Sequence, residues 1–303
     1  MGFLDFLVRH ARRSPHFTLR MEAEATALVE EDGRVVGVRA TAPDGELEIR
    51  ADLVIGADGR HSLVRERARL PVRDLGAPMD VLWFRLSRRP GDPEAIMGRI
   101  DAGRILVLIN RGDYWQCGFV IPKGSAELLR QRGVESFRAA IATLAPFFGD
   151  RVSELASWEP IKLLTVKVDR LLRWSRPGLL CIDDAAHAMS PIGGVGINLA
   201  IQDAVAAANI LAAPLRERRA GMADLRRVEK RRRLPTWIVQ TMQLTLQRRV
   251  IAAVLAKSGK ITPPPALRVI SRVPALRRLV GRVIGLGVRH EHVTINGVRS
   301  GMR

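Results

Sequence analysis

The segment Gly178–Leu211 constrains the fold of this chain more than any other part, and it reads GLLCIDDAAHAMSPIGGVGINLAIQDAVAAANIL. It opens with an apolar run typical of a strand buried on both faces. Two carboxylates, Asp183 and Asp184, follow where that strand would end, and a loop with Pro191 and three glycines comes next. A helical pattern completes the segment. A strand, a carboxylate at its end and a glycine-rich entry to a helix indicate a cofactor site in a doubly wound α/β domain.

A second segment, Ala51–Arg65, has the same organisation and reads ADLVIGADGRHSLVR. We expect a buried strand at Leu53–Ile55, a turn through Asp58 and Gly59, and a helix that begins near Ser62. Ser62 is a suitable N-cap, and an acidic residue in the first turn supports that start.

Together the two segments resemble the flavin-dependent aromatic monooxygenases of the para-hydroxybenzoate hydroxylase type, which include ubiquinone-pathway and polyketide hydroxylases. The first matches that family's motif Gly-Asp-Ala-Ala-His…Pro…Gly-x-Gly-x-Asn…Asp-Ala, and the second its Asp-Gly motif, which ends in Ser-x-Val-Arg. The resemblance implies an oxidoreductase with FAD as cofactor and NAD(P)H as reductant. Such an enzyme uses O2 to hydroxylate an aromatic or quinol-like substrate.

The resemblance also implies which residues hold FAD, while it leaves the catalytic residues unknown. Asp184 would accept a hydrogen bond from a ribityl hydroxyl, with a capping role as the alternative. The helix entered near Gly196 would direct its first N–H groups at the negative charge of reduced flavin. Asp58 and Arg65 would lie near the pyrophosphate or the nicotinamide; for Arg65 a surface arginine is the alternative. The cofactor set implied in this way is Asp58, Gly59, Arg65, Asp184, Pro191, Gly193, Gly194, Gly196, Ile197 and Asn198.

Four residues have both a functional and a structural interpretation. We favour a structural role for His187, as a hydrogen-bond partner of backbone near the flavin. Trp83, Trp115 and Trp158 fall on the expected substrate sheet, where the hydrophobic core is favoured over a substrate platform.

Cysteine and histidine usage bounds the chemistry further. Cys117 and Cys181 each lie in an apolar run, which favours two buried free thiols over a disulfide. The six histidines have no metal-ligand spacing, so no metal site is expected.

The chain departs from the family in two ways. It lacks the family's N-terminal strand–turn–helix with the sequence Gly-x-Gly-x-x-Gly. In the family, that element holds the adenosine and the pyrophosphate of FAD. We therefore expect a truncated member, inactive and without bound FAD as it stands. Asp183 also occupies the place of the motif's glycine, and we expect Asp183→Gly to raise FAD affinity once the N-terminal unit is restored.

These features predict an α/β protein of the α+β type, with a truncated Rossmann-like FAD-binding domain split by an inserted substrate domain. Turn signals place a β-meander between residues 18 and 58. The expected units are the first part of the FAD domain (1–71), an antiparallel substrate sheet (72–170), the second part of the FAD domain (171–213) and a basic helical region (214–303).

The C-terminal region carries nearly all of the charge. Residues 214–303 hold 21 Lys or Arg and four Asp or Glu, in a chain with a formal charge of +18. Leu267–Val288 has apolar residues at helical spacing with arginines between them, a pattern suited to an anionic membrane surface. The alternative to an enzyme is therefore a membrane-surface protein. With no signal peptide and no long apolar run, we expect a cytoplasmic location, peripheral to a membrane at most. Trp237 is the only aromatic residue of the basic region, which argues against nucleic-acid binding.

Overall fold

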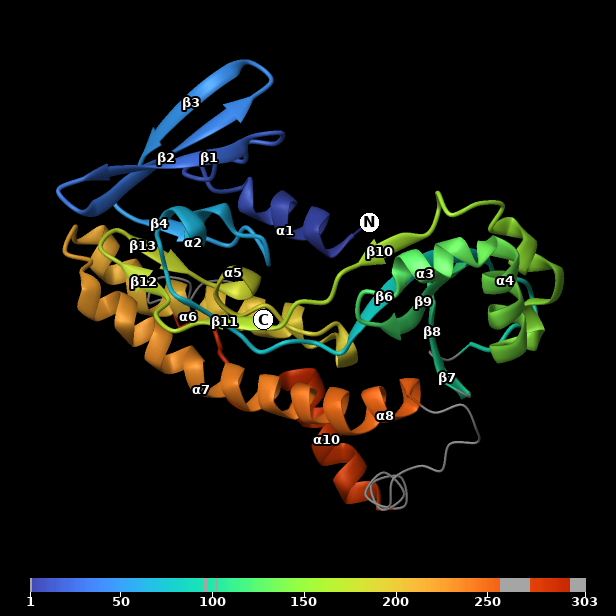
Figure 1. Cartoon of the computed structure of the whole chain (residues 1–303). Helices are drawn as coiled ribbons and strands as arrows, with labels where there is room; N and C mark the ends of the chain where they lie inside the picture. The colour runs from blue at the N-terminus through green and yellow to red at the C-terminus, as the bar shows by residue number, and fades with distance from the viewer. Residues whose placement is uncertain (1, 95–96, 102, 257–272, 295–303) are drawn as a thin grey trace.

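The computed structural model describes residues 2–94, 97–101, 103–256 and 273–294. The chain begins with α1 (Phe3–Ala11) and an antiparallel meander of β1 (Glu24–Glu31), β2 (Arg34–Ala42) and β3 (Gly45–Arg50). Figure 1 shows this meander at one end of an elongated molecule and a larger sheet at the other. The expected meander is confirmed, because Asp32–Gly33 and Pro43–Asp44 form its turns.

A small sheet with the order β12-β13-β4 lies next to the meander and contains the two motif strands. β4 (Val54–Gly56) and β13 (Leu179–Cys181) are parallel, and β12 (Ser175–Arg176) pairs with β13 in the antiparallel sense. α2 (Leu63–Arg67) follows β4, and α5 (Asp183–His187) follows β13. A core of apolar residues from these elements and from two long helices joins them, so both motifs belong to one packed unit.

The burial of the two motif strands agrees with expectation for one strand and differs for the other. All three residues of β13 are fully buried, as the apolar run predicts. β4, however, is an edge strand of its sheet, and Ile55 is 44% exposed. An edge strand presents unpaired N–H and C=O groups on its free side. The prediction of a strand buried on both faces is therefore right for β13 and wrong for β4.

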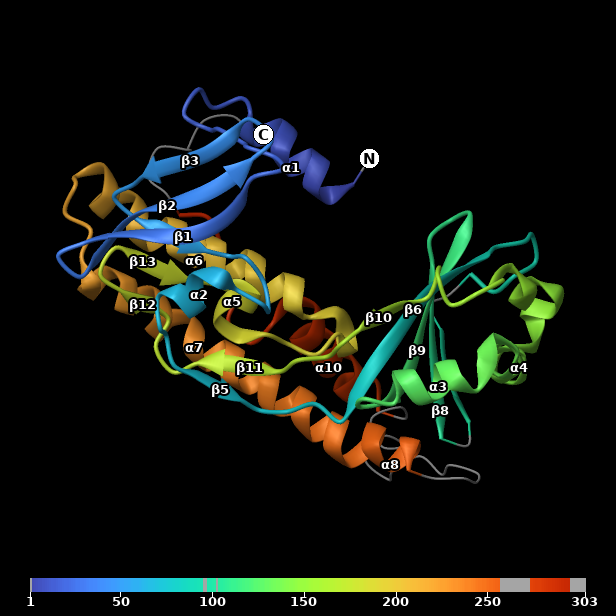
Figure 2. The same ribbon diagram turned by 45° about the horizontal axis from the view of Figure 1, so that its top comes forward.

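The second unit is a five-stranded antiparallel sheet with the order β10-β6-β9-β8-β7. Its strands are β6 (Met79–Ser87), β7 (Met97–Asp101), β8 (Arg104–Asn110), β9 (Tyr114–Pro122) and β10 (Lys162–Leu164). One face packs against α3 (Ala126–Gln131), α4 (Gly133–Leu144) and the 3₁₀ segment η1 (Pro146–Glu154). Figure 2 shows α3 and α4 on that side only. The expected antiparallel sheet is confirmed, although β7 had no sequence signal.

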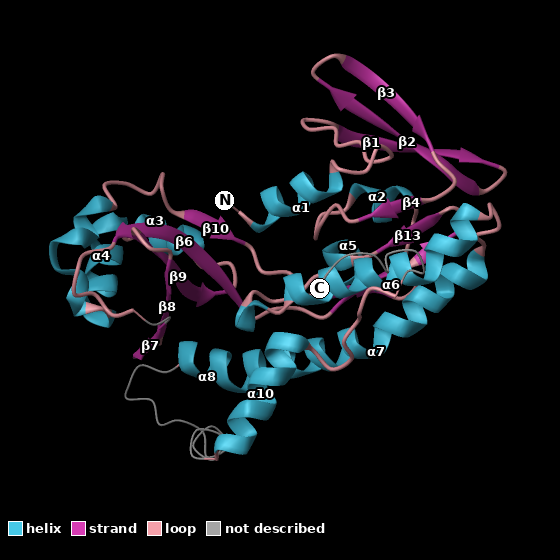
Figure 3. Ribbon diagram, turned by 180° about the vertical axis from the view of Figure 1, so that it is seen from behind, coloured by secondary structure: helices cyan, strands magenta, loops and turns pink. Residues whose placement is uncertain are grey.

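The ribbon of β5 (Val72–Asp74) and β11 (Asp169–Leu171) connects the two units. α6 (Gly196–Arg216) and α7 (Met222–Leu246) pack against each other beneath the parallel strands, as the view from behind shows in Figure 3. α7 continues through the π-helical turn η3 (Gln247–Ile251) into α8 (Ala252–Leu255), which reaches the five-stranded sheet. Proline usually ends or kinks a helix, but Pro235 lies inside the continuous α7.

The end of α10 (Pro274–Leu286) and the segment after it contact α6, where Asn209 Nδ2 donates to the carbonyl of His292 (2.7 Å). Residues 267–272 of the expected amphipathic stretch and the triple proline 263–265 lie outside the described residues. Among the described residues, Ile192–Arg216 is long and apolar enough to meet the length and hydropathy of a membrane span, which core helices of globular proteins also do. The expectation that no run approaches that length therefore needs this correction.

Candidate functional site

The glycine loop between α5 and α6 forms an open backbone surface. Gly193 and Gly194 adopt the left-handed conformation, with φ of 78° and 63°. A Cβ added to Gly194 or Gly196 would meet no atom within 4 Å, so the space beside these residues is free. α6 begins at Gly196, as predicted, and no side chain caps its N-terminus. The loop therefore presents backbone and a helix N-terminus to any flat ligand placed there.

Exposed apolar side chains flank this loop on α6. Ile197 is 57% exposed and Ile201 is 41% exposed, one turn further along the helix. The side chain of Asn198 donates from Nδ2 to the carbonyl of Gly285 (3.0 Å), so α10 contacts the helix start. The glycine loop is therefore bordered by two exposed apolar side chains.

Two carboxylates stand at the start of α5, next to the end of β13. Asp184 is partly buried and pairs with Arg60, with 3.6 Å between Oδ2 and Nη2. Asp183 adopts φ of 57°, the left-handed region that favours glycine. Burial and the neighbouring Asp184 raise the pKa of Asp183. The departure from the family motif at this residue therefore has a backbone cost as well as an electrostatic one.

A fully buried ion-pair network holds α5, α6 and α7 together. His187 Nε2 and Asp203 Oδ2 are 2.5 Å apart, and Arg232 Nε donates to Asp203 Oδ1 at 2.8 Å. Burial alone would lower the pKa of His187, but the charge and hydrogen bond of Asp203 raise it. Burial opposes ionisation of Asp203, yet His187 and Arg232 lower its pKa. The structural role expected for His187 agrees with this geometry, but its partner is a carboxylate and not backbone.

Two glutamines of α7 support the loop from below. Gln240 Nε2 donates to the carbonyls of Asp169 (2.8 Å) and Ala188 (3.2 Å). Gln243 Nε2 donates to the carbonyls of Ser190 (3.1 Å) and Ile192 (2.8 Å). Buried carbonyls need such donors, so these side chains fix the path of the loop.

Asp58 caps α2. It accepts hydrogen bonds from Ser62 Oγ (2.5 Å) and from the backbone N–H of Val64 (3.0 Å). Ser62 Oγ in turn accepts from the N–H of Arg65 (3.0 Å), as expected of an N-cap. Gly59 takes the positive φ of 82° that the turn requires. The Asp-Gly motif thus shapes the turn and helix that follow β4.

Arg65 lies elsewhere than expected. It is buried and forms a bidentate ion pair with Asp169, with distances of 3.0 and 3.1 Å. It also donates to the carbonyl of Arg60 (2.6 Å). The surface alternative is wrong, because the guanidinium is buried and ties α2 to β11, and the pyrophosphate contact stays a prediction. Arg60 is the arginine that stands beside Asp184.

The glycine loop meets the five-stranded sheet on the face away from α4. Ile192 packs against a cluster that includes Val81 and Val120 of that face. Trp83 lies on the same face, and a Cβ at Gly118 would come within 3.0 Å of its ring. The loop and the partly buried Trp83 therefore belong to one apolar cluster.

Trp115 and Trp158, for which a substrate platform was the alternative, belong to the hydrophobic core. Trp115 is fully buried, with its Nε1 donating to Asp92 (2.9 Å), and Trp158 packs on Phe137. Cys117 and Cys181 are free and buried, as expected, and burial raises the pKa of each thiol to about 12. No group of acidic, histidine and cysteine side chains in the described ranges could hold a metal ion.

The residues present fit the flavin half of FAD. A cradle without side chains, an uncapped helix N-terminus and the partly buried Asp184 are suited to a planar ring that carries negative charge and to a sugar-like hydroxyl chain. Sequence reasoning missed Arg60, Asp203, Arg232, Gln240 and Gln243. For the three residues of α7 the only signal was a polar residue at an otherwise apolar helical position, which by itself does not identify a partner. Asp203 is the aspartate of the Asp-Ala motif, and Arg60 had no signal.

Comparison with known proteins agrees with this geometry. The profile of a family described as an FAD binding domain matches residues 3–242. The 6-methylpretetramide 4-monooxygenase of Streptomyces rimosus is 36% identical over 92% of this chain and 67% of its own length. The ubiquinone hydroxylase UbiL of Rhodospirillum rubrum is 30% identical over 66% of this chain and 46% of its own length.

Solved structures share the fold. The anhydrotetracycline hydroxylase OxyS from Streptomyces rimosus superposes with a TM-score of 0.65 and 23% identity, over 93% of this chain and 56% of that chain. The chain thus spans about half to two thirds of the length of these proteins. Fold class and family agree with the sequence-based expectation.

Proposed function

The chain belongs to the FAD-binding domain family, and from this premise we propose that its protein hydroxylates an aromatic or quinol-like substrate with FAD and O2. The family makes it an FAD-dependent oxidoreductase. Relatives named for the hydroxylation of a polyketide and of ubiquinone support the reaction and the substrate class.

One observation supports the proposal beyond family membership: the glycine loop and the strand that carries Trp83 meet in one apolar cluster. Ile192 of the loop and Trp83 of the sheet both pack against that cluster. A flavin ring on the loop would therefore stand next to a half-buried aromatic surface. Proximity of ring and substrate is what oxygen transfer requires.

Each residue of the site would have a separate role toward the cofactor or the substrate. The backbone at Gly194 and Gly196 would lie against the ring, and the N–H groups of α6 would stabilise its negative charge when reduced. Asp184 would accept from the ribityl chain, with Arg60 orienting the carboxylate. Trp83 would form an aromatic wall for the substrate. The cofactor, when bound, supplies the reduction of O2 and the electrophilic oxygen.

NAD(P)H is the proposed reductant. The test is consumption of NADH and NADPH by the complete gene product with FAD, against a panel of phenols, quinols and polycyclic aromatics under ¹⁸O₂. A product heavier by one labelled oxygen supports the proposal. Substrate-stimulated consumption with a product that lacks the label would move the protein to another reaction class.

The membrane-surface alternative rests on the C-terminal region. Leu286 and Val288, at the end of α10 and after it, are exposed and lie beside basic residues. Sedimentation with anionic and neutral vesicles tests it: binding to anionic vesicles alone supports peripheral attachment, and protein that stays in the supernatant with both rejects it.

A further inference from the structure

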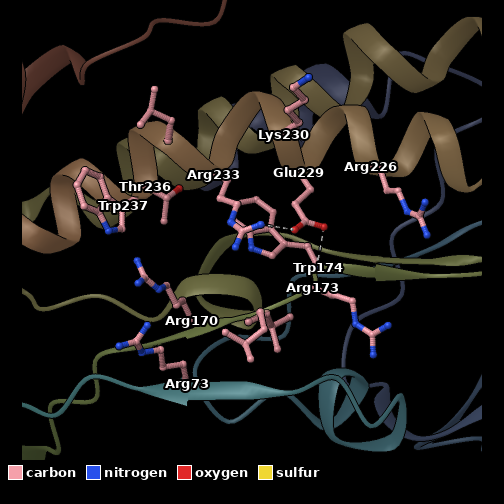
Figure 4. Close-up of a pocket in the computed structure, with 13 residues that line it drawn as sticks. Arg73, Arg170, Arg173, Trp174, Arg226, Glu229, Lys230, Arg233, Thr236 and Trp237 are labelled. Carbon is pink, nitrogen blue, oxygen red and sulfur yellow. Dashed lines mark hydrogen bonds and ion pairs between the residues drawn. The ribbon is translucent and has the colours of Figure 1, made fainter.

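The strongest feature outside the flavin site is a groove between α7 and the β5–β11 ribbon. It encloses about 790 Å³, within the range of small-molecule sites. Six cationic side chains line it, and we call it the basic groove: Arg73, Arg170, Arg173, Arg226, Lys230 and Arg233. Figure 4 shows Arg73 and Arg170 together on the ribbon side and the α7 side chains across from them.

The arginines of the basic groove lie close together, and too few carboxylates lie near them to balance their positive charge. Arg73 and Arg170 are direct partners in the antiparallel pairing of β5 with β11, an arrangement in which like charges destabilise. Burial, and then the charges of Arg73 and Arg233, lower the pKa of Arg170. Within the part of the chain that the structure describes, no ion pair is formed by Arg73, Arg170, Arg173 or Arg226.

Glu229 is the one acidic side chain among the lining residues, and it is already engaged. It accepts from the N–H of Trp174 (3.2 Å) and lies 3.7 Å from Arg233. One carboxylate therefore faces six cations. Such a site attracts an anion with several negative charges.

Two further observations point to a ligand and not merely to a charged surface. Thr236 lines the groove, is 2% exposed, and its Oγ1 has no hydrogen-bond partner. At one end of the groove the indole of Trp237 is 48% exposed, beside the exposed Leu234. A buried orphan hydroxyl and an exposed ring next to arginines suit a phosphate group attached to a flat or apolar body.

We propose that the basic groove binds a small phosphorylated ligand of the nucleotide class, with its phosphates on Arg73, Arg170 and Arg233 and its ring on Trp237. The concave form favours a soluble ligand over a membrane, because convergent arginines cannot all reach a flat bilayer. Trp174, at the back of the groove, packs on His187, with 5.0 Å between ring centroids. The groove therefore shares a contact with α5, the helix that precedes the glycine loop.

The test is calorimetric titration of the chain, without FAD, with ADP and with inorganic pyrophosphate. We expect saturable binding of both, tighter for ADP, and at least about tenfold weaker binding by the Arg73→Gln/Arg170→Gln double variant, because charge-assisted hydrogen bonds are lost. Arg227→Gln, on the same helix but outside the groove, is the matched control and should bind as the wild type does. Trp237→Ala should weaken ADP and leave pyrophosphate unchanged.

Folding of the variants provides an independent check. Removing two facing arginines should leave the melting temperature in low salt unchanged or higher, since their repulsion is lost. Absence of saturable binding to the wild type, equal affinity in the double variant, or adsorption to phosphatidylglycerol vesicles that depends on Arg73 and Arg170 in place of ADP binding would each overturn the proposal. No readout involves FAD or oxidation, so failure here is separate from failure of the proposed function.

Discussion

At the scale of single residues, Asp183 has the least favourable environment near the site. Its φ of 57° costs an L residue of the order of 1 kcal/mol, and glycine avoids this cost. We predict that Asp183→Gly raises the free energy of unfolding by about 1 kcal/mol, whereas Asp183→Ala, which keeps the strain, gains less. Chemical denaturation at pH 7 measures both. An alanine variant at least as stable as the glycine variant would show that charge, not backbone conformation, dominates.

The pH dependence of that gain has a defined sign. The pKa of Asp183 is raised in the folded protein, so its charge destabilises the fold above that pKa and not below the ordinary pKa of aspartate. The advantage of Asp183→Gly over wild type should therefore shrink as the pH falls toward 4. A gain that is constant between pH 4 and 7 contradicts the burial of this carboxylate.

The His187–Asp203 pair gives a second pH signature. The raised pKa of His187 means that its protonated form stabilises the fold fully below its ordinary pKa, and that this contribution is lost as the pH rises through the folded value. We expect His187→Gln to destabilise by about 1–3 kcal/mol at pH 6 and by less at pH 9. The exposed His10→Gln serves as control. Equal losses at both pH values would mean that His187 is neutral throughout.

Residues of this kind show where sequence reasoning reaches its limit. The glycines, Asp184 and the helix start at Gly196 lie where the motifs predict, because strand, turn and helix signals are local. The burial of Arg65 was not predicted because its partner, Asp169, is 104 positions away, and no local pattern identifies such a pair. Arg60 had no signal, since one arginine among so many looks like surface.

At the scale of elements, α7 is more than a basic helix. Its buried face carries Gln240 and Gln243, which hold the loop, and Arg232, which anchors Asp203. The proline at position 235 and the many arginines interrupt the apolar periodicity, so the sequence pattern does not reveal this buried face. Pro235 is itself buried, and tertiary packing maintains the helix across it.

This support can be tested directly. Gln243→Leu leaves the carbonyls of Ser190 and Ile192 without a donor, which should cost about 1–3 kcal/mol of stability and weaken FAD binding. Gln247→Leu is the matched control, because its buried amide has no hydrogen-bond partner and its loss should be harmless. If the two variants are equally stable and bind FAD alike, α7 does not position the loop.

At the scale of the whole molecule, the strand patterns predicted two sheets in separate parts of the chain. These are the N-terminal meander and the five-stranded antiparallel sheet. The edge position of β4 and the course of the C-terminal segment along α6 depend on long-range pairing and could not be predicted. Because the 303 residues contain no Gly-x-Gly-x-x-Gly and β4 has a free edge, we expect FAD to bind residues 1–303 weakly. Gel filtration after mixing should therefore separate the protein from the yellow cofactor, and a stable yellow complex would contradict this.

The central claim is that FAD lies on the glycine loop at the start of α6, and Gly196 offers the most direct measurement. A side chain there meets no atom of the protein, so Gly196→Leu should fold with an unchanged or slightly higher melting temperature. Equilibrium titration by flavin fluorescence should show saturable binding to the wild type and at least about tenfold weaker binding to Gly196→Leu, since the leucine fills the space of the ring. Equal affinity of the two proteins, or no saturable binding to the wild type, would contradict the account.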